Sequence, residues 1–228
     1  MDRGAHGLRF LIGRRPRAGL VGAAALLCVL GATAAAPARA PRPRRCTPAR
    51  AKPLAQDREA QVYSLRGQTS ASLVGTITYA CLRSSRRRTR IGETYNDNYV
   101  TSGAVDAVSL VGHMVGSAQH RTDISCKADC PPGYQPTVAA IQVNDLRRKT
   151  RRQVLITGRL LAHRLFLVAS GAAAWIEGTA ASARVKALDA AGAVRLLDEG
   201  MIDPSSVKLS GSTLSWTKDG SSHSVRLS

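Results

Sequence analysis

From residue 54 to its end, the sequence consists of short runs in which apolar and polar residues alternate, separated by Gly, Ser, Asp and Asn. Alternation with a period of two is typical of half-buried β-strands, whereas an amphipathic helix repeats about every 3.6 residues. The stretch most suited to a helix, residues 180–197, is interrupted by Gly192 and fits two strands joined by a turn better. Because 44% of the chain is hydrophobic, which is enough for a packed core, we predict an all-β domain over residues 54–228.

Four segments of this domain share a pattern: an apolar residue, a small turn residue two positions later, and then an apolar strand. They begin at Leu73, Leu110, Val168 and Leu209, about 40 residues apart except for one longer step. A period near 40 with several short strands per unit is typical of β-propeller blades. We predict propeller-like repeats of antiparallel strands in about four units, complete or partial, with a β-sandwich as the alternative. The last unit is short, so we expect its missing strand to come from the segment near Val62 and Leu65.

One hairpin of this repeat also carries a family resemblance. Val143, Asp145 and Leu146, with the basic residues that follow, resemble the pattern V-x-D-L-x-x-x-x-x-R-x-V that marks the outer hairpin of TolB-type and related β-propellers. The resemblance extends loosely over residues 60–228 and implies a propeller that serves as a platform for protein interactions. Four units are fewer than the six usual in that family, and no functional residue is carried over from it.

The first 34 residues have the features of a secretory signal peptide. Residues 1–17 hold five arginines and one acid, residues 18–36 form an apolar run without charge, and Ala32-Thr33-Ala34 offers the small residues that signal peptidase requires. The apolar run is long, so an uncleaved N-terminal membrane anchor is the alternative. In either case the remainder of the chain is exported, which predicts a secreted, extracellular or cell-envelope protein.

A linker rich in proline and arginine follows at residues 35–53; it has six basic residues and no acid. Beyond the signal peptide the chain has four cysteines, Cys46, Cys81, Cys126 and Cys130, and an even number in an exported chain predicts disulfides. The short separation of Cys126 from Cys130 favours a bond between them, which leaves Cys46 to bond with Cys81. Pairing of Cys46 with Cys126 or Cys130 is the alternative, and a zinc site is disfavoured because no CxxC pair is present.

No motif for catalysis, a cofactor or a metal is found in the sequence. The histidines of the domain, among them His113 and His120, do not occur in an HExxH motif, and no GxSxG or phosphate-binding glycine loop is present. Residues 96–98, Asn-Asp-Asn, fit an Asx-rich turn better than a calcium loop. We therefore predict no catalytic residue, no cofactor and no metal. The alternative is a secreted carbohydrate-active or other hydrolase that uses scattered residues, such as Asp123, Asp203 and the histidines, in a central pocket.

The formal charge of +18 is unevenly distributed. The signal peptide and linker together carry +10, and the domain carries +8, which two clusters more than account for. The predicted binding residues are the members of these clusters: Arg83, Arg86, Arg87, Arg88 and Arg90 in the first, and Arg147, Arg148, Lys149, Arg151 and Arg152 in the second.

Both clusters fall on the same hairpin turn of the repeat, so we predict that they are neighbours on one rim. Their proposed partner is an anionic wall polymer or an acidic protein, and the alternative is a pair of solvated turns that protect sheet edges. A nucleic-acid partner is not expected, because the chain is exported, has few aromatic residues and lacks a recognition helix. The sequence thus predicts an exported binding module without catalytic activity.

Overall fold

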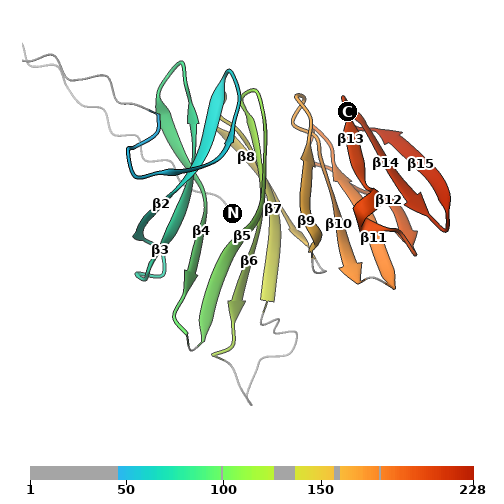
Figure 1. Ribbon diagram of the computed structural model, residues 1–228, viewed down its shortest axis with the longest axis horizontal. Helices are drawn as coiled ribbons and strands as arrows, with labels where there is room; N and C mark the ends of the chain where they lie inside the picture. Colours follow the sequence, from blue (N-terminus) through green and yellow to red (C-terminus); the bar gives the residue numbers. More distant parts are fainter. Residues whose placement is uncertain (1–45, 99, 126–136, 157–159, 180) are drawn as a thin grey trace, which may run out of the picture. The chain divides into compact units, whose positions relative to one another are not determined.

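The computed structural model describes residues 46–228 apart from 99, 126–136, 157–159 and 180, and it leaves out the side chains of residues 161–163 (Figure 1). The chain divides into two units, residues 1–42 and 43–228, and all described residues belong to the second. The regular structure of these residues is β-strand, apart from one 3-10 turn, η1 (Pro204–Ser206), so the all-β prediction is confirmed. Within this part of the chain no helix is long and apolar enough to cross a membrane. The predicted signal peptide and most of the predicted linker lie outside the described residues.

The first eight strands form one antiparallel sheet in which each strand pairs with the next. β4 and β5 pair only at Tyr95–Gly103 and Asn96–Ser102, so the sheet consists of two halves, β1–β4 and β5–β8. β1 begins at Lys52, inside the predicted linker. The strands are β1 (Lys52–Gln56), β2 (Ala60–Gln68), β3 (Val74–Leu82), β4 (Arg87–Asn96), β5 (Thr101–Val111), β6 (Met114–Asp123), β7 (Thr137–Asp145) and β8 (Thr150–Ile156).

Two smaller antiparallel sheets follow. The four-stranded sheet has the order β12-β11-β10-β9, and the three-stranded sheet has the order β13-β14-β15. Residues 180–197 contain the predicted hairpin rather than a helix, since β11 pairs with β12 across a turn that begins at Asp189. The strands are β9 (Leu160–Leu167), β10 (Ala173–Thr179), β11 (Ser182–Leu188), β12 (Val194–Gly200), β13 (Lys208–Ser210), β14 (Thr213–Lys218) and β15 (Ser221–Arg226).

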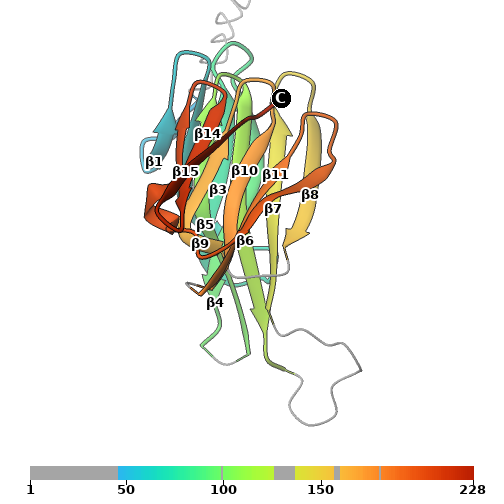
Figure 2. The ribbon, with the colours of Figure 1, turned by 90° about the vertical axis from the view of Figure 1, so that its right-hand side faces the viewer.

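Residues 46–228 are arranged as four layers, β1–β4, β5–β8, β9–β12 and β13–β15 (Figure 1). In Figure 2, which turns the right-hand side of Figure 1 toward the viewer, the last layer lies nearest the viewer. An apolar cluster fills each of the three spaces between successive layers, because the strands that border it place their apolar residues on that face. Representative members are Val62, Ile91 and Val115 in the first cluster, Ile141, Leu167 and Trp175 in the second, and Ile176, Leu214 and Trp216 in the third.

A fully buried carboxylate lies in the third layer. Glu177 accepts a hydrogen bond from Trp175 Nε1 at 2.9 Å and forms an ion pair of 2.6 Å with Lys186 Nζ. A buried charge is tolerated only where hydrogen bonds and an opposite charge replace water. These contacts connect β10 with β11, which are paired with Trp175 opposite Lys186.

Asp198 connects the third layer with the fourth. Its carboxylate accepts hydrogen bonds from Trp216 Nε1 and Lys218 Nζ, each at 2.8 Å. Burial opposes the ionisation of Asp198, but the hydrogen bonds from Lys218 and Trp216 outweigh it and hold the pKa of this carboxyl below its ordinary value. Trp175 and Trp216 are both buried, as expected of core anchors.

The outward face of the last layer is polar. The residues that point away from the third layer are Thr213, Ser215 and Thr217 in β14 and Ser222, Ser224 and Arg226 in β15. A terminal unit of a stacked array needs such a face to remain in water. The expectation that the segment near Val62 and Leu65 completes this layer is wrong, because both residues lie in β2, between β1 and β3.

The internal repeat is present, with one correction to its register. Leu110, Val168 and Leu209 lie at the first hairpin turn of the second, third and fourth layers, but Leu73 lies in the β2–β3 turn. The equivalent turn of the first layer is β1–β2. Backbone hydrogen bonds identify it, because they join the same two turns in the first two layers: Arg83 N donates to Glu59 O at 2.8 Å and Leu146 N to His113 O at 3.0 Å. In the fourth layer the matching bond runs from Leu227 N, just after β15, to Ser212 O at 2.8 Å.

Candidate functional site

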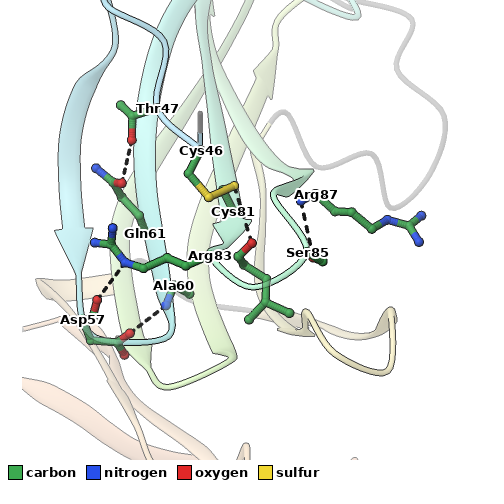
Figure 3. Close-up of a disulfide and its surroundings, with 10 residues drawn as sticks. Cys46, Thr47, Asp57, Ala60, Gln61, Cys81, Arg83, Ser85 and Arg87 are labelled. Carbon is green, nitrogen blue, oxygen red and sulfur yellow. Dashed lines mark hydrogen bonds between the residues drawn. A yellow bond between two sulfur atoms is a disulfide. The ribbon is translucent and has the colours of Figure 1, made fainter. Parts of the chain in front are cut away.

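The turns that follow β1, β3, β5 and β7 lie together at one end of the first two layers, because each antiparallel strand reverses the direction of the one before. We call this surface the turn end. Asp57 connects the turns of the first layer with those of the second. Asp57 Oδ1 accepts from Glu59 N and Ala60 N in its own turn, each at 2.8 Å, and Asp57 Oδ2 accepts from Gly112 N in the second layer at 2.6 Å. Figure 3 shows Asp57 and Ala60 beside Arg83 and Ser85 of the neighbouring turn.

The disulfide predicted between Cys46 and Cys81 is confirmed; it joins residues 35 apart in the sequence, with Cα atoms 5.6 Å apart (Figure 3). Cys81 is fully buried in β3, two residues before Arg83. Thr47 Oγ1 donates to Gln61 Oε1 at 2.6 Å and further fixes this segment. The bond indicates an oxidising compartment outside the cytoplasm. Cys126 and Cys130 lie outside the described residues.

The first basic cluster occupies the β3–β4 turn and the start of β4, and all five of its members are exposed. Two of them have structural partners. Arg83 Nε donates to Asp57 O at 3.1 Å, and Arg90 forms an ion pair with Glu93. Burial opposes the ionisation of Glu93, but hydrogen bonds from Ser70 and the charge of Arg90 outweigh it and lower its pKa. Arg86 lies in the turn and Arg87 at the first position of β4, and both side chains are exposed.

The second basic cluster occupies the β7–β8 turn and the start of β8. Asp145 shapes the turn, because its Oδ1 accepts from the backbone N–H groups of Arg147 and Arg148, each at 2.9 Å. Arg147 Nη2 donates to Glu59 Oε2 at 2.8 Å. Since Glu59 O also accepts from Arg83 N at 2.8 Å, Glu59 contacts both basic turns, which are thus neighbours across the β1–β2 turn.

Arg152 differs from the rest of the second cluster. Its Nη1 donates to Asp189 O at 2.5 Å and its Nη2 to Gly171 O at 2.7 Å, so the side chain connects the second layer to the third. Arg151, the neighbouring residue on β8, is exposed and lies on the opposite face of the strand. Arg152 is therefore a structural residue as well as a predicted binding residue.

A hollow of about 550 Å³ opens at the turn end between the second and third layers. We call it the turn-end pocket. Its polar lining comprises Arg147, Arg148 and Arg152, the carboxylate of Asp145, the imidazole of His113, and the hydroxyls of Thr150 and Ser170. Three guanidinium groups and the carboxylate of Asp145 line the pocket, and one oxygen of that carboxylate already accepts two backbone hydrogen bonds. Glu59, outside the lining, pairs with Arg147, so cations still outnumber carboxylates. The pocket is therefore positively charged.

The histidines and acids of the alternative hydrolase hypothesis have separate neighbours. His113 lies 3.4 Å from Glu59 Oε2 and 3.8 Å from Asp145 Oδ1, whereas His120 Nδ1 lies 2.8 Å from Asp106 Oδ2. Asp123 Oδ1 accepts from Ser125 N, and Asp203 Oδ1 caps η1 by accepting from Ser205 N. Each is thus placed in a different local contact rather than in a shared pocket.

Sequence reasoning missed two features of these contacts. It did not find Asp106 as the partner of His120, because Asp106 lies in a β-bulge between Val105 and Ala107 that shifts the strand register. It also overlooked Glu59, although an acid in a short turn next to an arginine cluster is a recognisable signal. The Asx-rich turn at residues 96–98 is confirmed, since Asn96 Oδ1 accepts from Asn98 N at 2.7 Å.

Comparison with protein-family models, with curated proteins and with solved structures finds nothing that matches this chain. The described fold is a set of antiparallel sheets in four layers with a cluster of basic turns at one end. Function is inferred from the chemistry of that end.

Proposed function

We propose that this chain is an exported binding module of the cell envelope or extracellular space, and that its turn end binds an anionic polymer. One observation carries the proposal: Arg86, Arg87, Lys149 and Arg151 are all exposed on two neighbouring turns. The carboxylates beside them are engaged, since Asp57 and Asp145 accept backbone hydrogen bonds and Glu59 forms an ion pair with Arg147. Such a surface attracts polyanions over distances of about a Debye length.

A polymer suits this surface better than a folded acidic protein. Protein interfaces usually have an apolar, fully desolvated centre surrounded by a polar rim. Both basic turns lie wholly within the described ranges, and none of the large exposed apolar side chains belongs to them. A flexible polyanion needs no such centre, because the release of its counterions supplies most of the affinity.

The disulfide fixes the end of the linker next to this surface. It attaches Cys46 to β3, immediately before the first basic turn. The predicted linker at positions 35–53, to which Cys46 belongs, has six basic residues in its sequence. This supports a role for the linker in binding, in addition to its role as a spacer after the proposed signal peptide at residues 1–34.

Beyond the all-β fold class, we propose that the four layers form an open, propeller-like stack, and the contacts between successive layers support this. In the first two layers the first strand contacts the first strand of the next, β1 with β5 and β5 with β9, and in the third layer β9 contacts η1, which precedes the strands of the fourth. Propeller blades adjoin in this way through their inner strands. The polar outer face of β14 and β15 suits the end of an open array better than a closed ring.

The test of the binding function is retention on isolated cell wall and on immobilised anionic polymer across a salt gradient. Reversing Arg86, Arg87, Arg148 and Arg151 to Glu changes the charge of the turn end by eight units and should abolish salt-sensitive retention. The matched control reverses four exposed basic residues elsewhere: Arg66, Arg121, Lys208 and Arg226. Retention should survive in the control, because the contacts are local. Equal loss in both variants, or unchanged retention in the first, contradicts the proposal.

A further inference from the structure

The turn-end pocket is a more specific site than the exposed arginines around it. Its volume of about 550 Å³ is in the range of small-molecule sites. A hollow of similar volume beside Arg86 and Arg87 is lined by the β3–β4 turn and the start of β4 alone, with no serine or threonine hydroxyl other than that of Ser85. Four turns surround it, β5–β6, β7–β8, β9–β10 and β11–β12, so its walls come from two layers held by the second apolar cluster.

Arg152 forms a fixed, positively charged part of this pocket. Two backbone carbonyls of the third layer, those of Gly171 and Asp189, hold its guanidinium at 2.7 and 2.5 Å. Arginine has five N–H donors, so the remaining ones are available to an oxygen-rich group in the pocket. Gly171 permits this arrangement, because it has a φ of +85° and a Cβ there would lie 2.6 Å from Arg152 Nη2.

Two hydroxyls complete a set of donors suited to an oxyanion. Ser170 Oγ accepts a long hydrogen bond from Ala172 N at 3.4 Å, which leaves its O–H free to donate. Thr150 follows the β7–β8 turn and also lines the pocket. Arg148 lines the pocket and is 83% exposed, with its Nε 3.9 Å from Asp145 Oδ2.

We propose that the turn-end pocket binds a single oxyanionic group, a phosphate, sulfate or carboxylate, together with part of the polymer unit that carries it. The inference rests on the proposed function. The proposed function concerns the overall charge of the polymer, whereas this inference names the chemical group of the polymer that the pocket recognises. Arg152 and Arg148 supply charge-assisted hydrogen bonds, and Ser170 and Thr150 supply neutral ones. The volume of the pocket exceeds that of a bare oxyanion, which leaves room for an adjoining sugar or polyol.

The test is a titration of the purified, ¹⁵N-labelled chain with inorganic phosphate, sulfate and galacturonate, followed by NMR. We expect saturable, millimolar binding with shifts confined to backbone amides of the turns that line the pocket, including those of His113 and Ser170. Arg148→Gln should weaken binding about tenfold. Ser170→Ala serves as a second variant that leaves the charge unchanged. Arg66→Gln removes the same charge at an exposed position of β2, away from both basic turns, and should leave the small-anion affinity as it is.

Each outcome decides the question. Shifts spread evenly over both basic turns, or equal weakening by Arg66→Gln and Arg148→Gln, contradict a defined pocket. Absence of saturable shifts with intact retention on immobilised polymer refutes the pocket and leaves the polymer function standing. Absence of polymer retention refutes the proposed function itself. Preference among the three anions then separates a phosphodiester polymer from a sulfated or uronate polymer.

Discussion

Two cationic residues of the turn end, Arg86 and Lys149, have backbone conformations that glycine adopts more easily than they do. Arg86 has a φ of 54° and Lys149 a φ of 60°, in the left-handed region that favours glycine. They hold the same position in equivalent turns, because Arg86 N donates to Leu82 O and Lys149 N to Asp145 O, both at 2.8 Å. The corresponding β11–β12 turn has Gly192, with a φ of 100°. We predict that Arg86→Gly and Lys149→Gly stabilise the protein while weakening polymer binding.

The magnitude follows from two opposing effects. A residue with a Cβ in the left-handed conformation costs about 1–2 kcal/mol, and glycine removes that cost. Glycine also loses more conformational freedom on folding, which costs about 0.5–1 kcal/mol. Both side chains are exposed, so little packing is lost. The expected net gain is roughly 0.5–1 kcal/mol for each substitution and about twice that for the double variant.

Urea unfolding measures this gain as a raised midpoint at unchanged slope, and the elution salt on immobilised polymer measures binding. Arg87→Gly is the matched control, because it removes the same charge beside Arg86 at a residue without positive φ. That control should weaken binding similarly but lower stability by about 0.5–1 kcal/mol, as glycine does within a strand. Unchanged or lowered stability in both turn variants would refute the strain argument. Unchanged retention would show that these cations do not bind the polymer.

Other predictions concern stability. Cys46→Ser should lower the free energy of unfolding by about 3–4 kcal/mol, because the bond closes a loop of 35 residues; a loss below about 1 kcal/mol in denaturant titration would show that the loop is constrained otherwise. Glu177→Gln should cost about 3 kcal/mol, since it leaves Lys186 without its buried counter-charge, and a neutral result by calorimetry contradicts this account. Arg152→Met should cost about 2–3 kcal/mol by losing two hydrogen bonds between layers, whereas Arg152→Lys should cost less. The pKa of Asp198 is lower in the folded state than in the unfolded chain, so its ionised carboxylate stabilises the fold above about pH 4. This contribution is lost as the pH falls through the lowered pKa. The free energy of unfolding, measured against pH, should therefore decline less on acidification in Asp198→Asn than in the unsubstituted protein.

The fold class was predictable because some strands keep a period-two alternation, and β11 shows this clearly: Ala183, Val185 and Ala187 are buried, and Ser182, Arg184 and Lys186 are not. The turn positions at Leu110, Val168 and Leu209 were predictable for the same reason. The error at Leu73 arose because small residues mark every tight turn, including the β2–β3 turn at the opposite end of the first layer. Sequence alone does not tell the two ends of a strand apart.

The candidate surface was predictable only as a set of charges. Arg151 and Arg152 are adjacent and chemically identical, yet one is exposed and the other connects two layers. Alternation places them on opposite faces of β8, but which face meets the next layer depends on how the layers pack. The same limit applies to Arg83 and Arg147, because their partners, Asp57 and Glu59, lie in a turn that is close in space but distant in the sequence.

The location of the charge follows from the fold. Side chains in the strands of a layered sheet protein are constrained by packing on both faces, so the turns offer the positions where charge density can change at little cost in stability. At the turn end the aspartates that begin turns, Asp57, Asp145 and Asp189, direct their oxygens at backbone amides of their own turns. For Asp189 the hydrogen bonds, first that from Ala193, lower the pKa, so this carboxylate stays ionised while its oxygens are occupied. Acids thus shape the turns and cations extend from them, which gives a basic surface on a domain whose remaining residues are nearly neutral.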